Sequence, residues 1–313
     1  MTDKVRLVPV PSKSMIPERD ADKKPVLEVY NLGIEFGGLH AVEDFSIALG
    51  KTEISGLIGP NGAGKTTVFN LLTNVYTPTN GAIILDGKNT AGKSTHDVNK
   101  MGLARTFQNI CLFSDMSVLD NVKVGLHNSI KYSSFEAVFR MPRYFKAEKE
   151  ANEKAMELLS LFGLQDTAKV KAGNLPYGAQ RKLEIARALA TDPKVLLLDE
   201  PAAGLDPRGR DEILSRICEY RSKYGASVVM ISHSMEDMAR YCDRILVMNG
   251  GKVFMCGTCE EIFSEAERLE SVGLAVPQIT KLMLELKRRG FDVNTAVYTV
   301  DSAEAEVRRL LTG

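Results

Sequence analysis

The chain has 313 residues, 44% of them apolar, which is enough for one large α/β domain with an appendage or for about two domains. Forty basic and forty acidic residues give a formal net charge of zero, which argues against a general nucleic-acid binder. No apolar run has the length of a membrane span, and the N-terminal residues lack the apolar core of a signal peptide, so we expect a soluble cytoplasmic protein.

The five cysteines are scattered and odd in number, which is typical of a reducing compartment. Cys256 and Cys259 form a C-x-x-C pair, but no second pair or histidine cluster accompanies them. Because structural zinc takes four ligands, we do not expect a zinc site there.

Short strands are predicted in the first part of the chain. Residues 1–25 are rich in Pro, Lys, Asp and Ser without periodicity, which predicts a flexible tail. Strand-like runs follow at residues 26–30, 45–49 and 82–85, and Asn-Gly and Asp-Gly pairs flank the third run.

A glycine-rich segment carries the first chemical signal. The apolar run 53–58 predicts a buried strand, and residues 67–75 predict a helix with Val68, Leu71, Leu72 and Val75 on one face. The segment between them fits the pattern G-x-x-x-x-G-K-[S/T] and consists of Gly59, Pro60, Asn61, Gly62, Ala63, Gly64, Lys65, Thr66 and Thr67.

Such a loop directs its N–H groups at phosphate oxygens, next to the positive end of the following helix. Lys65 should reach the β- and γ-phosphates of a nucleotide, and the Thr66 hydroxyl should ligate Mg²⁺. A glycine turn without a ligand is the weaker interpretation, because a strand and a helix flank the segment.

A second match to the same pattern, at residues 87–94, is interpreted as a surface loop. Residues 96–102 after it are short and polar, too weak for a buried crossover helix, and context decides such matches.

Residues 112–190 are predicted to be mostly helical. One helix has its apolar face at Met156, Leu158, Leu159, Leu161 and Phe162 and stops at Gly163. Another begins near Gly178 and ends before Asp192.

Two buried strands are predicted next, at residues 194–198 and 227–231, followed by a hairpin over 245–254. Beyond Cys259 the chain is predicted to be helical again. Ile279, Leu282, Met283 and Leu286 recur at helical spacing between Pro277 and Gly290.

Polar residues at the strand ends suggest the chemistry. Asp199 is placed to ligate the Mg²⁺ of a phosphate loop, and Glu200 to polarise a water that attacks the γ-phosphorus. His233 should contact the γ-phosphate and hold that water, while Gln108 is a candidate ligand for Mg²⁺ or the water. Alone, each residue would be interpreted as structural or as part of a solvated turn. The phosphate loop upstream favours the catalytic interpretation.

As a set, these motifs resemble the nucleotide-binding subunit of an ATP-binding cassette (ABC) transporter. The resemblance rests on residues 59–67, Gln108, 175–180, 194–200, 204–206 and His233, which occur in the family's order between about Val26 and Gly257. It implies an α/β fold with a phosphate-loop NTPase (RecA-like) core sheet, an inserted helical subdomain and a small C-terminal helical extension. The implied domains are 26–258 for the cassette, with its helical subdomain at about 96–190, and 259–313 for a dimerisation extension.

The resemblance also implies how the chain works with partners. Two cassettes bind two ATP molecules between them, and each site is completed by the partner's signature loop, here with Leu175, Gly178 and Gln180. Phe36 would stack on adenine, Asp206 would bridge the two sites, and Gln108 would sense a membrane subunit gripped by the helical subdomain.

The signature loop departs from the usual Leu-Ser-Gly-Gly-Gln, because it reads Leu175-Pro176-Tyr177-Gly178-Ala179-Gln180. Pro176 supplies neither the usual hydroxyl nor an N–H. The helix that begins near Gly178 still directs its positive end at the phosphate.

Two branches of the family are represented. Residues 26–203 resemble ATPases of branched-chain amino-acid importers, and residues 204–313 resemble ATPases of energy-coupling-factor (ECF) vitamin transporters. The chain therefore resembles a composite joined near residues 202–205.

We predict an ATPase that drives an importer, with ATP and Mg²⁺ as ligands and branched-chain amino acids as the favoured solutes. The expected partners are membrane permease subunits and a second ATPase subunit, identical or different, on the cytoplasmic face of a bacterial or archaeal plasma membrane. An ECF vitamin importer is the alternative, and a soluble ABC protein without a transport role is less favoured. A binding module without turnover is disfavoured, because Lys65, Asp199, Glu200 and His233 are all present.

Overall fold

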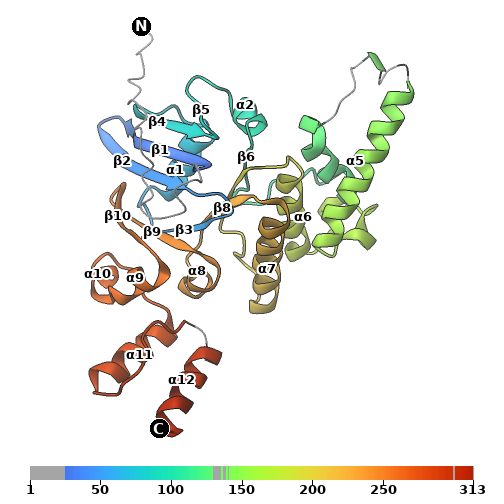
Figure 1. The fold of residues 1–313 in the computed structure, drawn as a ribbon. Helices are drawn as coiled ribbons and strands as arrows, with labels where there is room; N and C mark the ends of the chain where they lie inside the picture. The colour runs from blue at the N-terminus through green and yellow to red at the C-terminus, as the bar shows by residue number, and fades with distance from the viewer. Residues whose placement is uncertain (1–24, 130–134, 137–138, 140, 299, 313) are drawn as a thin grey trace.

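The computed structural model describes residues 25–129, 135–136, 139, 141–298 and 300–312. Nearly all of the predicted flexible tail, residues 1–25, lies outside the described residues. The predicted α/β fold class is confirmed, and Figure 1 shows the strands grouped together with helices beside and below them.

A six-stranded sheet with strand order β10-β9-β3-β8-β7-β6 forms the core. Its strands are β3 (Ile54–Ile58), β6 (Leu103–Arg105), β7 (Val195–Asp199), β8 (Ser227–Ile231), β9 (Arg244–Asn249) and β10 (Lys252–Gly257). All neighbours are parallel except β10, which pairs antiparallel with β9. Because parallel strands end at one edge, the segments after β3, β6, β7 and β8 converge there.

A second, antiparallel sheet covers one face of the core sheet. It consists of β1 (Leu27–Phe36), β2 (Leu39–Leu49), β4 (Asn80–Leu85) and β5 (Lys88–Asn89), in the order β2-β1-β4-β5. Helix α1 (Lys65–Leu72) shares its apolar core with this sheet. Along β7, Val195 and Leu197 join that core, while Leu196 and Leu198 face the helices on the opposite side.

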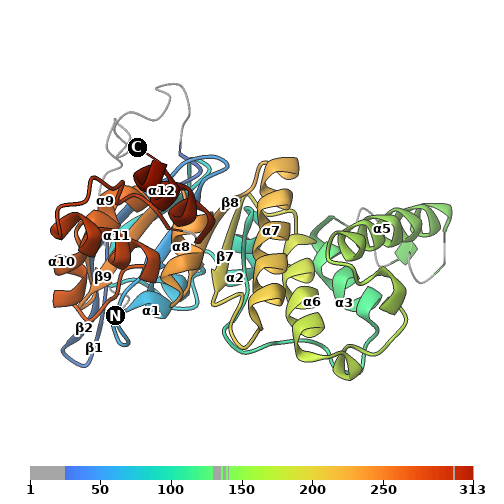
Figure 2. The same cartoon turned by 90° about the horizontal axis from the view of Figure 1, so that it is seen from below.

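The apolar core on the opposite side of the core sheet extends into a set of helices. They are α3 (Val118–Gly125), α5 (Pro142–Leu161), α6 (Tyr177–Leu189), α7 (Pro207–Tyr224) and α8 (Met235–Tyr241), with short 3₁₀ turns η1 (Leu126–Ser129), η2 (Gln165–Thr167) and η3 (Ala172–Asn174). Figure 2 shows α3, α5 and α6 together as a helical lobe at one end of the molecule. No helix within the described residues combines the length and apolarity needed to cross a bilayer.

The C-terminal segment divides into two parts. Helices α9 (Cys259–Ser264) and α10 (Ala266–Ser271) bury Phe263 and Leu269 in the main core. Helices α11 (Gln278–Arg288) and α12 (Val300–Thr312) enclose a small separate core of Met283, Val293, Val297 and Ala303. The apolar stripe predicted on α11 is thus partly covered by the same chain, although Leu282 stays 49% exposed.

Some local details differ from the predictions. Residues 96–102 were predicted to be too weak for a buried crossover helix, and a short helix, α2 (Thr95–Lys100), lies there, capped by Ser94 and anchored by buried Val98. Val75 lies beyond α1 and is exposed. Strand β6 was not predicted at all, since its three residues are too few to show a periodic pattern.

Candidate functional site

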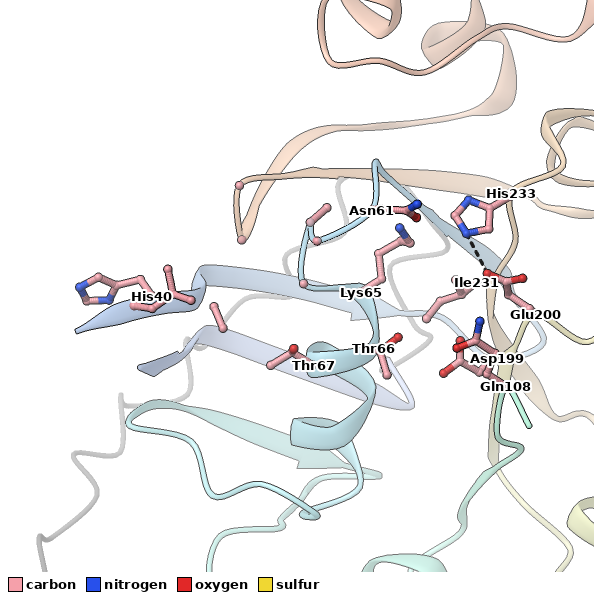
Figure 3. Close-up of a pocket in the computed structure, with 17 residues that line it drawn as sticks. His40, Asn61, Lys65, Thr66, Thr67, Gln108, Asp199, Glu200, Ile231 and His233 are labelled. Atoms are coloured by element: carbon pink, nitrogen blue, oxygen red, sulfur yellow. Dashed lines mark ion pairs between the residues drawn. The ribbon is translucent and has the colours of Figure 1, made fainter. Parts of the chain in front are cut away.

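A pocket of about 500 Å³ opens where the core strands end. It gathers most of the predicted site residues, namely Asn61, Gly62, Ala63, Gly64, Lys65, Thr66, Thr67, Gln108, Asp199, Glu200 and His233 (Figure 3). Gly59 and Pro60 are not in its lining but contribute backbone carbonyls to Lys65. The convergence follows from topology, since these residues lie after β3, β6, β7 and β8.

The phosphate loop is fixed by close backbone packing. Gly64 has a φ of 94°, and a Cβ built on it would lie 2.6 Å from the Ala41 carbonyl oxygen. Gly251, in the turn after β9, has a φ of 79° and would likewise place a Cβ 2.9 Å from that oxygen. The Gly251 N–H donates to the Ala63 carbonyl at 3.2 Å. Only glycine fits both positions, so β2 and the β9–β10 turn together hold the loop.

Sequence reasoning missed these neighbours of the loop, which include Leu39, His40, Ala41, Ile231, Gly250 and Gly251. Gly250 and Gly251 were the available signal for this contact with the loop, but they were interpreted only as part of a hairpin turn.

The Lys65 ammonium is held over the loop. Its Nζ donates to the Gly59 carbonyl at 2.6 Å and to the Pro60 carbonyl at 2.9 Å. Burial lowers the pKa of Lys65, while the charges of Glu200 and Asp199 act in the opposite direction. A phosphate in the pocket would add a further counter-charge to this buried cation.

Asp199 is 2% exposed, and an arginine neutralises its carboxylate. Arg105 at the end of β6 places Nη2 3.1 Å from Asp199 Oδ2 and donates through Nη1 to Asn70 Oδ1 at 2.6 Å. Burial raises the pKa of Asp199, and the Arg105 charge opposes that rise. Sequence reasoning did not identify Arg105, because nothing local marks a pair separated by so much of the chain.

Glu200 and His233 lie next to each other at one side of the pocket (Figure 3). His233 Nε2 lies 2.8 Å from Glu200 Oε1. The Glu200 side chain is 19% exposed and that of His233 is 52% exposed, so this side of the pocket is open.

The oxygen donors in the pocket fit Mg²⁺. The Thr66 hydroxyl, the Gln108 amide and the Asp199 carboxylate line one cavity, and hard oxygen ligands are those that Mg²⁺ prefers. Within the part of the chain that the structure describes, no group of three or more His, Cys, Asp or Glu side chains is placed to hold a metal. A site of this composition suits a cation held largely through substrate phosphates.

The remaining predicted residues lie outside this pocket. Phe36 is 46% exposed and contacts the Tyr76 ring edge-on, with centroids 5.4 Å apart. Leu175, Gly178 and Gln180 lie at the start of α6, where Gln180 Nε2 donates to the Leu175 carbonyl at 2.8 Å. Asp206 caps α7 by accepting the Gly209 N–H at 3.1 Å.

A glycine loop between a strand and a helix, a lysine held over it, and carboxylates at neighbouring strand ends define a phosphate-loop nucleotide-binding protein.

Comparisons identify the family. The model of the protein family "ABC transporter" matches residues 42–203. The high-affinity branched-chain amino acid transport ATP-binding protein BraF of Pseudomonas aeruginosa is 41% identical over 239 residues, covering 76% of this chain and 94% of that protein. The chain belongs to the ABC transporter family, and it is an ATP-hydrolysing subunit of that family's kind.

Relatives from both transporter branches suggested by the motifs, the branched-chain amino-acid and the energy-coupling-factor ATPases, are similar to this chain. The energy-coupling factor transporter ATP-binding protein EcfA2 of Caldanaerobacter subterraneus is 36% identical over 289 residues, covering 91% of this chain and 95% of that protein. The crystal structure of the ADP conformation of MJ1267, an ATP-binding cassette of an ABC transporter, aligns with a TM-score of 0.68 at 29% identity, covering 79% of this chain and 97% of that one. The predicted resemblance and the phosphate-loop NTPase fold are therefore confirmed.

Proposed function

We propose that the chain energises a branched-chain amino-acid importer by hydrolysing ATP between two cassettes on the cytoplasmic face of the plasma membrane. The observation that carries ATP turnover is the Glu200–His233 pair beside Lys65 at one pocket. The choice of solute is supported by the 41% identity to BraF, of which 94% is covered. An ECF importer is the second candidate, because the match to EcfA2 covers 91% of the chain and therefore extends into the C-terminal segment.

Each side chain in the pocket has a proposed task. Lys65 neutralises the β- and γ-phosphates, and Thr66, Asp199 and Gln108 hold Mg²⁺, which supplies further charge neutralisation when bound. Glu200 accepts a proton from the water that attacks the γ-phosphorus, and the bond to ADP breaks to release inorganic phosphate. His233 orients Glu200 through their 2.8 Å contact.

The residues outside the pocket support a dimer. Leu175, Gly178 and Gln180 would complete the partner's site, since the start of α6 offers unpaired backbone N–H groups to a phosphate. Asp206 would bridge the two sites, and Phe36, exposed at the end of β1, would stack on adenine. Residues 259–313 would form a further pairing surface.

A second cavity supports docking of a permease. It has about 520 Å³ and lies between β6, α3 and α6. Phe113 and Val124 line it and are 49% and 41% exposed, and Phe107 beside it is 44% exposed. An apolar groove of this kind fits an amphipathic helix from a membrane subunit.

Isolation of the tagged chain from native membranes, with identification of its partners, tests the proposal. We expect a branched-chain amino-acid permease to co-purify, and we expect Phe113→Asp to weaken that association. Val170→Asp, similarly exposed at 39%, serves as the control and should leave it unchanged. Recovery of a vitamin permease would favour the ECF alternative, and recovery without any membrane protein would favour a soluble ABC protein.

A further inference from the structure

Arg181 and Glu184 on α6 form a fully buried ion pair that the proposed reaction does not use. Arg181 is 0% exposed and Glu184 is 1% exposed, and Arg181 Nη1 lies 2.9 Å from Glu184 Oε2. Their spacing of three residues places both side chains on one face of α6. A buried ion pair adds little net stability by itself, so its partners in the surroundings are informative.

Most of those partners belong to the segment around Gln108, and the other is the Tyr177 hydroxyl, 3.4 Å from Arg181 Nη2. Arg181 donates to the Phe107 carbonyl at 2.9 Å and to the Gln108 carbonyl at 2.7 Å. Glu184 Oε1 accepts the N–H groups of Phe107 and Cys111, each at 3.4 Å. One helix thus holds donors and acceptors of the same loop.

The contacts reach only the backbone of Gln108. Its side chain lines the nucleotide pocket, beside Asp199 and Glu200 (Figure 3). Arg181 and Glu184 therefore fix where the loop lies and leave the Gln108 amide available for chemistry. Since α6 also begins with the signature loop, any displacement of that helix is passed to the loop through these four bonds.

We propose that Arg181 and Glu184 are positioning residues that make Gln108 follow the signature helix α6. The pair would connect the element that completes the partner's nucleotide site with a ligand of this chain's own site. This inference rests on the proposed role of Gln108.

A mutant cycle on the full chain tests the proposal through the turnover number. We compare the wild type, Gln108→Ala, the double variant Arg181→Met with Glu184→Leu, and the triple variant. Gln108→Ala and the double variant should each lower kcat about 10–100-fold. The kcat of the triple variant should be no lower than that of the more impaired of these two variants, because both changes act through Gln108. The KM for ATP should change little, since Lys65 and its loop are untouched.

Two further measurements separate positioning from folding. Without nucleotide, the amides of Phe107 and Cys111 should exchange hydrogen faster in the double variant. Lys182→Met is the matched control, because the neighbouring Lys182 pairs with Glu212 at 2.7 Å and not with the loop. The Lys182→Met variant should change neither the hydrogen exchange of these amides nor kcat. Arg181→Lys keeps the positive charge but cannot bind the Phe107 and Gln108 carbonyls through two separate nitrogens. This variant should stay folded and have a partly reduced kcat.

The proposal would be overturned if the fold-loss of kcat in the triple variant equalled the product of the losses in Gln108→Ala and in the double variant. A double variant with wild-type kcat would also overturn it. If Gln108→Ala alone keeps wild-type kcat, the proposed role of Gln108 is wrong and this inference fails with it. If Gln108→Ala lowers kcat and the cycle is additive, only the positioning role fails.

Discussion

His233 Nε2 lies 2.8 Å from Glu200 Oε1, although the two residues follow different strands of the core sheet. Glu200 has a φ of 50°, in the left-handed region that side-chain-bearing residues rarely adopt, at a cost of about 1–3 kcal/mol. Its N–H donates to the Ile231 carbonyl at 3.0 Å, which holds the turn in place. The strained backbone thus accompanies a carboxylate directed at the pocket and at His233.

Glu200→Gln should bind ATP and nearly abolish turnover. Loss of a positioned base typically lowers the rate by about 10²–10⁴-fold, and the amide keeps the shape of the side chain and its contact with His233. Steady-state hydrolysis together with equilibrium binding of ATP checks both parts. Turnover at the wild-type rate would show that Glu200 is not the base.

Lys65→Ala should give the opposite result, a loss of ATP affinity. Removing the ammonium takes away the charge that we propose neutralises the β- and γ-phosphates, while Glu200 and His233 stay in place. Binding of ATP measured by calorimetry should weaken strongly in this variant and stay close to wild type in Glu200→Gln. Equal affinities for the two variants would contradict the assignment of Lys65.

Arg105→Met should destabilise the fold by about 3–5 kcal/mol at neutral pH, because it leaves the buried Asp199 carboxylate unpaired. Burial raises the pKa of Asp199 and Arg105 opposes the rise, so the variant should take up a proton at a higher pH than the wild type. A group whose pKa is raised in the folded state binds its proton more tightly there, and protonation removes the cost of burial. The difference in unfolding free energy should therefore shrink from pH 7 to pH 5. Urea titrations at both pH values check this, and a pH-independent difference would contradict it.

The centre of the site was predictable because its signals are local. The buried run before Gly59, the helix after Lys65 and the acidic pair after β7 each lie in one short stretch. Their convergence also follows from sequence, since parallel strands end at one edge.

The supporting contacts were not predictable, because they join distant segments. Arg105 meets Asp199 across 94 residues, and Arg181 meets the Phe107 carbonyl across 74. Nothing near Arg181 distinguishes it from a charge on a solvated helix face. The C-terminal segment is a further case, because Phe263 packs in the main core whereas Met283 packs in a separate small one.

A chain ending at Pro277 should keep its fold and bind ATP, but it should self-associate more weakly. The cut spares α9 and α10, which bury Phe263 and Leu269 in the main core. It removes the small core around Met283, together with Leu284 and Tyr298, which are partly buried at the edge of the main core. Exposed Leu282 and Phe291, at 49% and 52%, would be lost from the pairing surface. Analytical ultracentrifugation with ATP should show a weaker dimer.

A cut at Gly257 provides the contrast. It would open the main core and should lower the unfolding temperature, whereas the cut at Pro277 should change it little. Unchanged association of the chain ending at Pro277 would show that α11 and α12 have another role.

Pro176→Ser should tighten the ATP-bound dimer in a Glu200→Gln background. Pro176 occupies the N-cap of α6 without any side-chain cap, and in a dimer this helix start would face the partner's γ-phosphate. A serine hydroxyl would add a hydrogen bond to a charged group, on the order of 1.5–3 kcal/mol. Tyr177 is retained in this variant, because its hydroxyl donates to the Ala203 carbonyl at 3.3 Å within the same chain.

Pro176→Ala separates the hydroxyl from the backbone change, since it removes the ring and offers no hydrogen bond. Dimer dissociation constants with ATP and Mg²⁺ should fall for the serine variant by about 10–150-fold for each of the two sites, which corresponds to 1.5–3 kcal/mol per hydrogen bond. They should stay near wild type for alanine. A serine variant that dimerises no better than alanine would mean that this helix start does not contact the partner's nucleotide.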